Sequence, residues 1–194
     1  MLEKLPDVVG QALRTTRAGL EALTLGRFEA PSGIVVTSPA FDAGAAMPVR
    51  FTADGAGVSP PLRWTGVPAG TRSVAVLVED ADSPTPKPLV HAIVHDLPAG
   101  DGGLEEGAMA GEGGAPVGRN SFLRSGWLPP DPPPGHGPHR YVFQVYALDL
   151  DPADAASPGR GDLVELMTGH VLATGTLVAT FERPGADAAA AGRT

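Results

Sequence analysis

The chain has 194 residues, of which 42% are hydrophobic, and its formal net charge is −8 at pH 7. This length and composition fit one ordinary domain with a substantial core. The acidic balance argues against nucleic-acid binding, which depends on clustered Lys and Arg. The sequence contains no cysteine, which excludes disulfides, thiolate catalysis and cysteine-ligated zinc.

Apolar residues recur at helical spacing near the start of the chain. They are Leu5, Val8, Val9, Ala12, Leu13, Thr16, Leu20 and Leu23. The pattern predicts an amphipathic helix over about 5–25, within an N-terminal extension of residues 1–30. We expect its apolar stripe to pack on the main domain or on a twin subunit, with binding to a membrane surface as the alternative.

Short β-type runs separated by Gly, Pro, Asn and Asp make up the rest. They cover 34–38, 48–52, 62–64, 73–79, 89–96, 115–122, 139–148 and 175–182. This pattern predicts a mostly β domain over 31–184 with two packed antiparallel sheets. One short C-terminal helix is expected, capped by Asp162 and ending near Gly169. Residues 185–194 are expected to form a disordered tail.

No apolar run is long enough to span a membrane, and no secretory signal is recognisable. We therefore expect a cytoplasmic protein without integral membrane association. Metal binding is not expected, because His91 and His95 would lie nearly 14 Å apart along a strand.

Polar residues follow or begin three of the predicted strands. Asp80 and Asp82 end the buried run 73–79, and His91 lies near the start of the next run. Pro132 and Pro133 belong to a rigid loop that leads into His139 and Tyr141. On an extended strand His139, Tyr141, Phe143 and Val145 share one face. His136, in the loop, is expected to face solvent.

Three motifs occur in order between about residues 34 and 182. They are Asp54-Gly55 with 59–64, Asp80-Ala-Asp-Ser-Pro84 with Val90-His91, and Gly135-His-Gly-Pro-His-Arg-Tyr141. Together they resemble the phosphatidylethanolamine-binding protein (PEBP) family, in particular its bacterial kinase-inhibitor-like branch of the YbhB/YbcL type. The resemblance implies an antiparallel β-sandwich of PEBP type and a head-group pocket formed by the matching residues.

Several positions depart from the family pattern. Ala81 stands in place of a proline, Ala92 in place of a tryptophan, and Asp131 where a cysteine is common. Trp127 lies near the place of a usual tyrosine, and Ser121 replaces an acidic residue. Ala92 leaves space that a different ligand or a neighbouring side chain can fill.

The first functional hypothesis is a binding protein that needs no cofactor. Its ligand would be a phosphate or carboxylate, a phospholipid head group, or an acidic side chain of a protein partner. The expected ligand-binding residues are Asp80, Asp82, His91, Pro132, Pro133, His139 and Tyr141. A carboxylate that accepts a hydrogen bond from an imidazole fixes its tautomer and raises its pKa, and the outward-facing ring nitrogen can then donate to the ligand. The family name suggests modulation of a kinase or protease.

Two alternatives stay open. Asp80, Asp82, His91 and His139 are the materials of general acid–base catalysis, which makes an enzyme acting on a small metabolite the second hypothesis. The third is a protein-interaction module, or a homodimer, that works through the N-terminal helix. The residues favour a binder over an enzyme.

Overall fold

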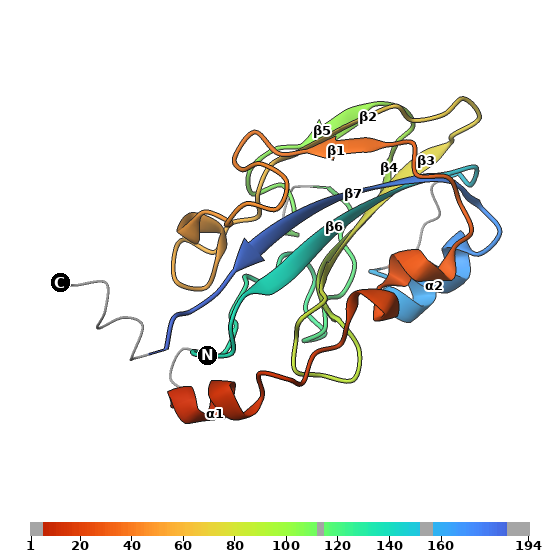
Figure 1. Cartoon of the computed structure of the whole chain (residues 1–194). Coiled ribbons are helices and arrows are strands. Elements are labelled where there is room, and N and C mark those ends of the chain that lie inside the picture. Colours follow the sequence, from red (N-terminus) through yellow and green to blue (C-terminus); the bar gives the residue numbers. More distant parts are fainter. Residues whose placement is uncertain (1–5, 112–114, 152–156, 186–194) are drawn as a thin grey trace.

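Two antiparallel sheets form the body of the protein, in a computed structural model that describes residues 6–111, 115–151 and 157–185 (Figure 1). The strands are β1 (Val35–Thr37), β2 (Leu62–Thr65), β3 (Ser73–Asp80), β4 (Leu89–Pro98), β5 (Gly102–Leu104), β6 (His139–Leu148) and β7 (Val171–Phe181). The smaller sheet has the order β1-β2-β5 and the larger one β4-β3-β6-β7. The predicted mostly β, antiparallel fold is confirmed.

The end of β3 is the meeting point of the larger sheet. All residues of β3 are buried, and the strand pairs with β4 on one side and β6 on the other. Asp80, its last residue, pairs with Leu89 of β4 and with Tyr141 of β6. The antiparallel register thus brings the end of β3 beside the beginnings of both neighbours.

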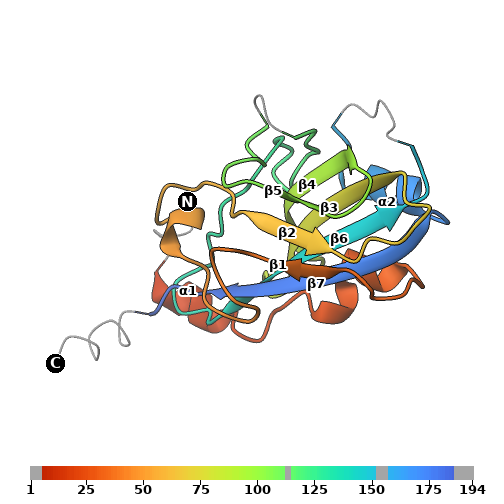
Figure 2. The same cartoon turned by 90° about the horizontal axis from the view of Figure 1, so that it is seen from above.

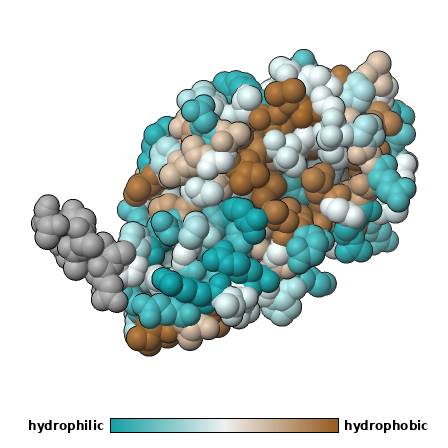
Figure 3. Space-filling model, in the orientation of Figure 1, coloured by the Kyte–Doolittle hydropathy of each residue, from teal (hydrophilic) through white to brown (hydrophobic). Residues whose placement is uncertain are grey.

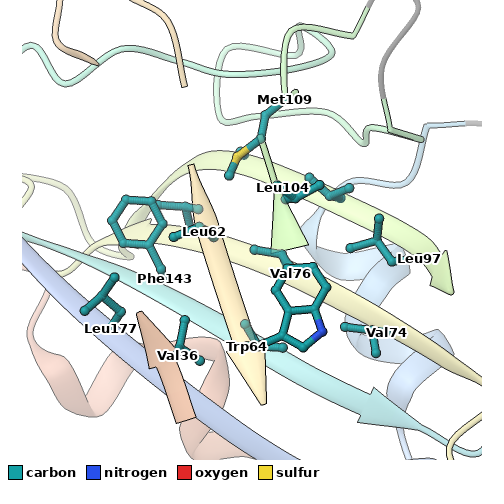
Figure 4. Packing of buried hydrophobic residues seen from close by; sticks show 14 of the residues in the cluster. Val36, Leu62, Trp64, Val74, Val76, Leu97, Leu104, Met109, Phe143 and Leu177 are labelled. Carbon is teal, nitrogen blue, oxygen red and sulfur yellow. The ribbon is translucent and has the colours of Figure 1, made fainter. Parts of the chain in front are cut away.

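The hydrophobic core lies between the sheets (Figure 4). Leu62 and Trp64 of β2 are almost wholly buried and belong to the same cluster as Val74, Val76 and Phe143 of the larger sheet. Alternation along each strand turns every second side chain into this layer. Each fully buried side chain of this kind stabilises the fold by about 1.5–3 kcal/mol.

The outer face of the larger sheet is covered by α2 (Arg160–Met167) and by the first part of the chain (Figure 1). Leu163 and Met167 of α2 are fully buried in one cluster with Leu77 and Ile93 of the sheet. The helix is capped at Gly159, three residues before the predicted cap Asp162. Asp162 is its third residue, and its carboxylate accepts a 2.9 Å hydrogen bond from the Gly159 N–H.

Residues 6–28, which we call the N-terminal strap, lie along this outer face (Figures 1 and 2). The prediction of one helix over 5–25 is wrong for the described part of that range, which begins at residue 6. The strap contains α1 (Asp7–Ala12) and two 3-10 turns, Leu20–Ala22 and Thr24–Arg27. Between them the backbone N–H groups of Ala18 and Gly19 donate to the carbonyls of Ser83 and Ala81, at 3.1 and 2.8 Å. These tertiary bonds, with Gly19 at φ 93°, replace the helical pattern that local spacing favours.

A buried carboxylate anchors the strap. Glu79 is fully buried and accepts hydrogen bonds from the Thr24 N–H and hydroxyl, at 2.8 and 3.0 Å, and from Gln144. Arg160 of α2 forms an ion pair with the same carboxylate at 3.0 Å. Leu23 of the strap is buried, whereas Val8 in α1 is 69% exposed. Figure 3 shows the surface over α1 as mostly hydrophilic, with a small apolar area at its outer edge.

Two predicted strands are absent from the described residues. The run 48–52 forms a 3-10 turn, Val49–Phe51, which begins after Pro48 and buries Phe51. The run 115–122 makes only isolated bridges, because it bends into a loop around Asn120. The strand predicted at 175–182 begins earlier, at Val171. Residues 186–194, most of the predicted tail, lie outside the described part of the chain.

In the described part of the chain, no helix has the length and apolar character needed to cross a membrane.

Candidate functional site

The candidate site lies where β3 ends and β4 and β6 begin. Asp80 closes β3 directly beside Tyr141. His91 is the extra residue of a β-bulge, because Val90 and Ala92 pair with consecutive residues of β3. A bulge re-aims the side chain that it carries. Here it brings the His91 ring edge-on to Tyr141, with the ring centroids 5.1 Å apart.

A cavity of about 180 Å³ opens among these strand ends. Five of the residues predicted for the site line it: Asp80, His91, Pro132, Pro133 and His139. Sequence reasoning missed several others, including Ser83, Leu89, Phe122, Arg124 and Leu128. No motif marks the loop that carries Phe122, because its place depends on a tertiary bond from the Ser121 N–H to the Val90 carbonyl, at 3.0 Å.

A chain of hydrogen bonds runs from the cavity wall to the N-terminal strap. His139 Nδ1 lies 2.7 Å from Asp80 Oδ2, and His139 Nε2 lies 2.7 Å from His136 Nδ1. His136 Nε2 lies 2.8 Å from the Leu13 carbonyl oxygen. A carbonyl oxygen only accepts, so His136 Nε2 carries a hydrogen. The second oxygen of Asp80 accepts from the Asp82 N–H at 2.9 Å.

His136 is therefore an internal residue, and the expectation that it faces solvent is wrong. Its exposed fraction is 1%. The strap covers the loop that carries it, which local sequence does not reveal. Burial lowers the pKa of His136, and the proximity of a second imidazole, that of His139, lowers it further, which favours a neutral ring.

His91 and Tyr141 each hold a buried polar atom that has no hydrogen-bond partner among the described residues. His91 Nδ1 donates to the Leu128 carbonyl at 2.6 Å, while His91 Nε2 and the Tyr141 hydroxyl have no such partner. Burial lowers the pKa of His91 despite the nearby carboxylate of Asp80. Its Nε2 is then a hydrogen-bond acceptor. Burial also raises the pKa of Tyr141 well above its ordinary value, so the hydroxyl keeps its hydrogen.

Asp82, predicted to share the cavity with Asp80, does not line it. The prediction assumed an extended segment, but β3 ends at Asp80 and the chain turns at Asp82. Both Asp82 oxygens bind Arg140, at 2.7 Å each, and Arg17 of the strap lies 2.9 Å away. Burial alone would raise the pKa of Asp82, but these hydrogen bonds outweigh it and lower the pKa to about 2. Asp82 joins the strap to β6.

Tyr141 is likewise absent from the cavity lining, because it lies beneath the imidazoles. Its ring stacks against that of His139, with the centroids 6.4 Å apart. The indole of Trp127 packs against His91, at 6.1 Å between centroids, and stacks on Phe143. An aromatic layer thus supports the lining, and the imidazoles of His91 and His139 are its members that line the cavity.

Arg183, which no sequence motif marked, holds the proline loop in place. It is 8% exposed, forms ion pairs with Asp54 and Asp131, and donates to the Pro132 carbonyl at 2.8 Å. Asp131, at the position of a common cysteine, is thereby held at the cavity wall. The Arg183 carbonyl also accepts a 3.0 Å hydrogen bond from the Gly135 N–H, so this network joins the first and third sequence motifs to the loop.

Comparison with known proteins agrees with this arrangement. The family model described as phosphatidylethanolamine-binding protein matches residues 37–182, which include all three motifs. The chain belongs to the PEBP family. A UPF0098 protein of Pyrococcus horikoshii is 37% identical over 116 residues, which span 58% of each chain. This chain therefore covers less than two thirds of that relative. YbhB of Escherichia coli is 37% identical over 120 residues, spanning 59% of this chain and 75% of YbhB.

Two solved structures of PEBP type share the fold. A PEBP homologue from Chlamydia trachomatis superposes with a TM-score of 0.71 at 35% identity, covering 78% of this chain and 99% of its own. YbcL of Escherichia coli, described as a member of the mammalian PEBP family, gives 0.71 at 31% identity with the same coverage. The predicted YbhB/YbcL-type branch is confirmed. The family match begins at residue 37, so the N-terminal strap lies outside it.

Proposed function

We propose that this PEBP protein binds a small acidic group, a phosphate or a carboxyl, in the cavity between Asp80, His91 and His139. The observation that carries the proposal is a pair of buried atoms that have no hydrogen-bond partner among the described residues. One is Nε2 of His91, a residue that lines the cavity, and the other is the hydroxyl of Tyr141, whose ring packs against both lining imidazoles. A buried polar atom without a partner costs about 1–3 kcal/mol, which a bound ligand can recover.

The polarity of these groups defines what the ligand presents. The Tyr141 hydroxyl can donate a hydrogen bond, whereas His91 Nε2 has a lone pair and needs a hydrogen from the ligand. A singly protonated phosphate or an undissociated carboxyl offers both an acceptor and a donor. The cavity volume of about 180 Å³ is below the roughly 300 Å³ at which drug-sized pockets begin, and fits a head group better than a large molecule.

Binding in this manner is linked to protons. The ligand brings the hydrogen for His91, or His91 takes one from solvent. A phosphate monoester has its second pKa near about 6 and His91 has a lowered pKa, so affinity rises as the pH falls towards 6. Above both pKa values one proton is taken up on binding, so the affinity rises about tenfold for each unit by which the pH falls.

Isothermal titration calorimetry with methyl phosphate tests the proposal. We expect saturable binding to the wild type that tightens by about tenfold from pH 7.5 to 6.5. In Tyr141→Phe the affinity falls and the pH dependence stays. Tyr146→Phe is the matched control, because its hydroxyl bonds to Gln144 on the opposite face of the sheet. Absence of binding at millimolar ligand throughout this pH range refutes the proposal.

A second candidate function is acid–base catalysis on a small metabolite. It is favoured by the Asp80–His139 pair, which is hydrogen bonded at 2.7 Å and lines the cavity. Phosphorus NMR of phosphorylated metabolites recovered after incubation separates the two functions. A binder returns them unchanged, and an enzyme returns them altered in the wild type but not in His139→Gln.

A further inference from the structure

The N-terminal strap is attached to the loop that carries His136 and His139. Arg14 Nε donates to the Gly135 carbonyl at 2.7 Å, and Arg17 donates to the carbonyls of Pro138 and His136 at 2.9 and 3.2 Å. Gly10 of α1 packs so closely that an added Cβ would lie 2.0 Å from the Pro134 carbonyl oxygen. The strap therefore belongs to the outer wall of the site, although the cavity is lined by other segments.

The hydrogen bonds that begin at Leu13 require a definite number of hydrogens. Three bonds in a row join the Leu13 carbonyl, His136, His139 and Asp80, and each needs one hydrogen. The carbonyl supplies none and two neutral imidazoles supply two. Wherever the third hydrogen resides, Asp80, His136 and His139 then have no net charge together. Without the Leu13 carbonyl only two hydrogens are needed, and the three side chains carry one negative charge.

We propose that docking of the N-terminal strap adds one proton to the Asp80–His139–His136 network and thereby adapts the cavity to an acidic ligand. The inference rests on the proposed anion binding and concerns its regulation. Asp80 and His139 line the cavity, so the charge that the strap removes lies at the ligand's wall. A unit charge about 6 Å from an anionic ligand changes its affinity about tenfold at an effective dielectric constant of about 40.

The other charges near the two imidazoles are three guanidinium groups and one carboxylate, which leave a net charge of +2. They come from the strap, the turn after β3 and the start of β6: Arg14, Arg17, Asp82 and Arg140. Arg17 and Arg140 both bind the Asp82 carboxylate, which offsets part of their positive charge. His91 is neutral because burial lowers its pKa. The carbonyl of Leu13 is thus the feature of the strap that sets the hydrogen count.

The test compares two glycines of the same strap in the full chain. Gly10→Ala places a methyl group 2.0 Å from the Pro134 carbonyl oxygen and 2.9 Å from the backbone nitrogen of His136. This clash lifts α1 off the loop. Gly26→Ala is the control, because the nearest atom to its added Cβ is 3.8 Å away. Nitrogen-15 NMR of the imidazoles and carbon-13 NMR of the Asp80 carboxyl at pH 7.5 count the hydrogens. Amide hydrogen exchange over 7–19 verifies the release of the strap.

We expect three hydrogens in the wild type and in Gly26→Ala, and two in Gly10→Ala. Affinity for methyl phosphate should fall about tenfold in Gly10→Ala alone. A second variant, His136→Phe, removes the acceptor for His139 Nε2 while the backbone carbonyls that bind Arg14 and Arg17 remain. It should leave a single hydrogen between His139 and Asp80 and weaken methyl phosphate to a similar extent.

The outcomes separate this inference from the proposed function. Two hydrogens in the wild type, or three in Gly10→Ala with the strap released, overturn the role of the strap. Unchanged methyl phosphate affinity in both Gly10→Ala and His136→Phe overturns its effect on the ligand. If the hydrogen count changes as expected but the protein binds no phosphate, the strap does retain the proton. Only the proposed anion binding is then refuted.

Discussion

The two tyrosines of this chain provide a crossed test of the site, because they lie on opposite faces of β6 in different hydrogen-bonding situations. The Tyr146 hydroxyl donates to Gln144 at 2.7 Å, whereas the Tyr141 hydroxyl has no protein partner. A buried hydrogen bond contributes about 1 kcal/mol, and an unsatisfied buried hydroxyl costs about 1–3 kcal/mol. We therefore expect Tyr146→Phe to lower the free energy of unfolding by about 1 kcal/mol, and Tyr141→Phe to leave it unchanged or raise it by up to about 1 kcal/mol.

Urea denaturation followed by fluorescence and circular dichroism measures both effects. For a chain of 194 residues, 1 kcal/mol also corresponds to a shift in Tm of roughly 2–4 °C. Binding should show the reverse order, since methyl phosphate affinity falls in Tyr141→Phe and stays constant in Tyr146→Phe. If Tyr141→Phe lowers the unfolding free energy by more than about 1 kcal/mol, its hydroxyl has a structural partner and the reasoning is wrong.

Three further perturbations test the surroundings of the site. Glu79→Ala leaves the Arg160 guanidinium without its buried ion-pair partner and should destabilise the fold by about 3 kcal/mol in urea, whereas Glu106→Ala, at an exposed pair, should cost less than about 1 kcal/mol. The pKa of Asp82 is about 2 in the folded protein against 3.8 ordinarily, so its contribution of about 2 kcal/mol is present above pH 4 and lost as the pH falls from about 4 to 2. In Asp82→Asn the unfolding free energy, measured by urea denaturation at each pH, should depend less on pH over this range. A pH dependence equal to that of the wild type would contradict the assignment. Leu123 is 79% exposed at φ 59°, so Leu123→Asn should raise the Tm through a gain of about 0.5–1 kcal/mol; a lower Tm would show that the loop is not strained.

Much of the site follows from local sequence. Period-2 alternation is a property of any extended strand, so Tyr141, Phe143 and Val145 could be placed on one face before the fold was known, and all three lie in the core cluster between the sheets. The motifs marked Asp80, His91 and His139, and the register of β3 with its neighbours brings them to one cavity.

The errors arise where tertiary contacts override a local pattern. A helix over 5–25 satisfies its own hydrogen bonds, but Ala18 and Gly19 find carbonyl partners after β3 instead. The prediction that Asp82 points with Asp80 fails because β3 ends at Asp80, two residues before Asp82, and the chain turns there. The pairing of Arg183 with Asp54 and Asp131 joins residues up to 129 positions apart, which no local pattern encodes.

Composition, alternation and motif order by themselves determined a mostly β, acidic domain of the PEBP type with imidazoles and a carboxylate at its strand ends. Only the tertiary structure decided the hydrogen-bonding state of those groups. The bulge turns His91 towards Tyr141, and the strap places the Leu13 carbonyl on His136. The physical reason is range: alternation depends on adjacent residues, whereas a buried donor or acceptor is satisfied by whichever distant group the packing brings within about 3 Å.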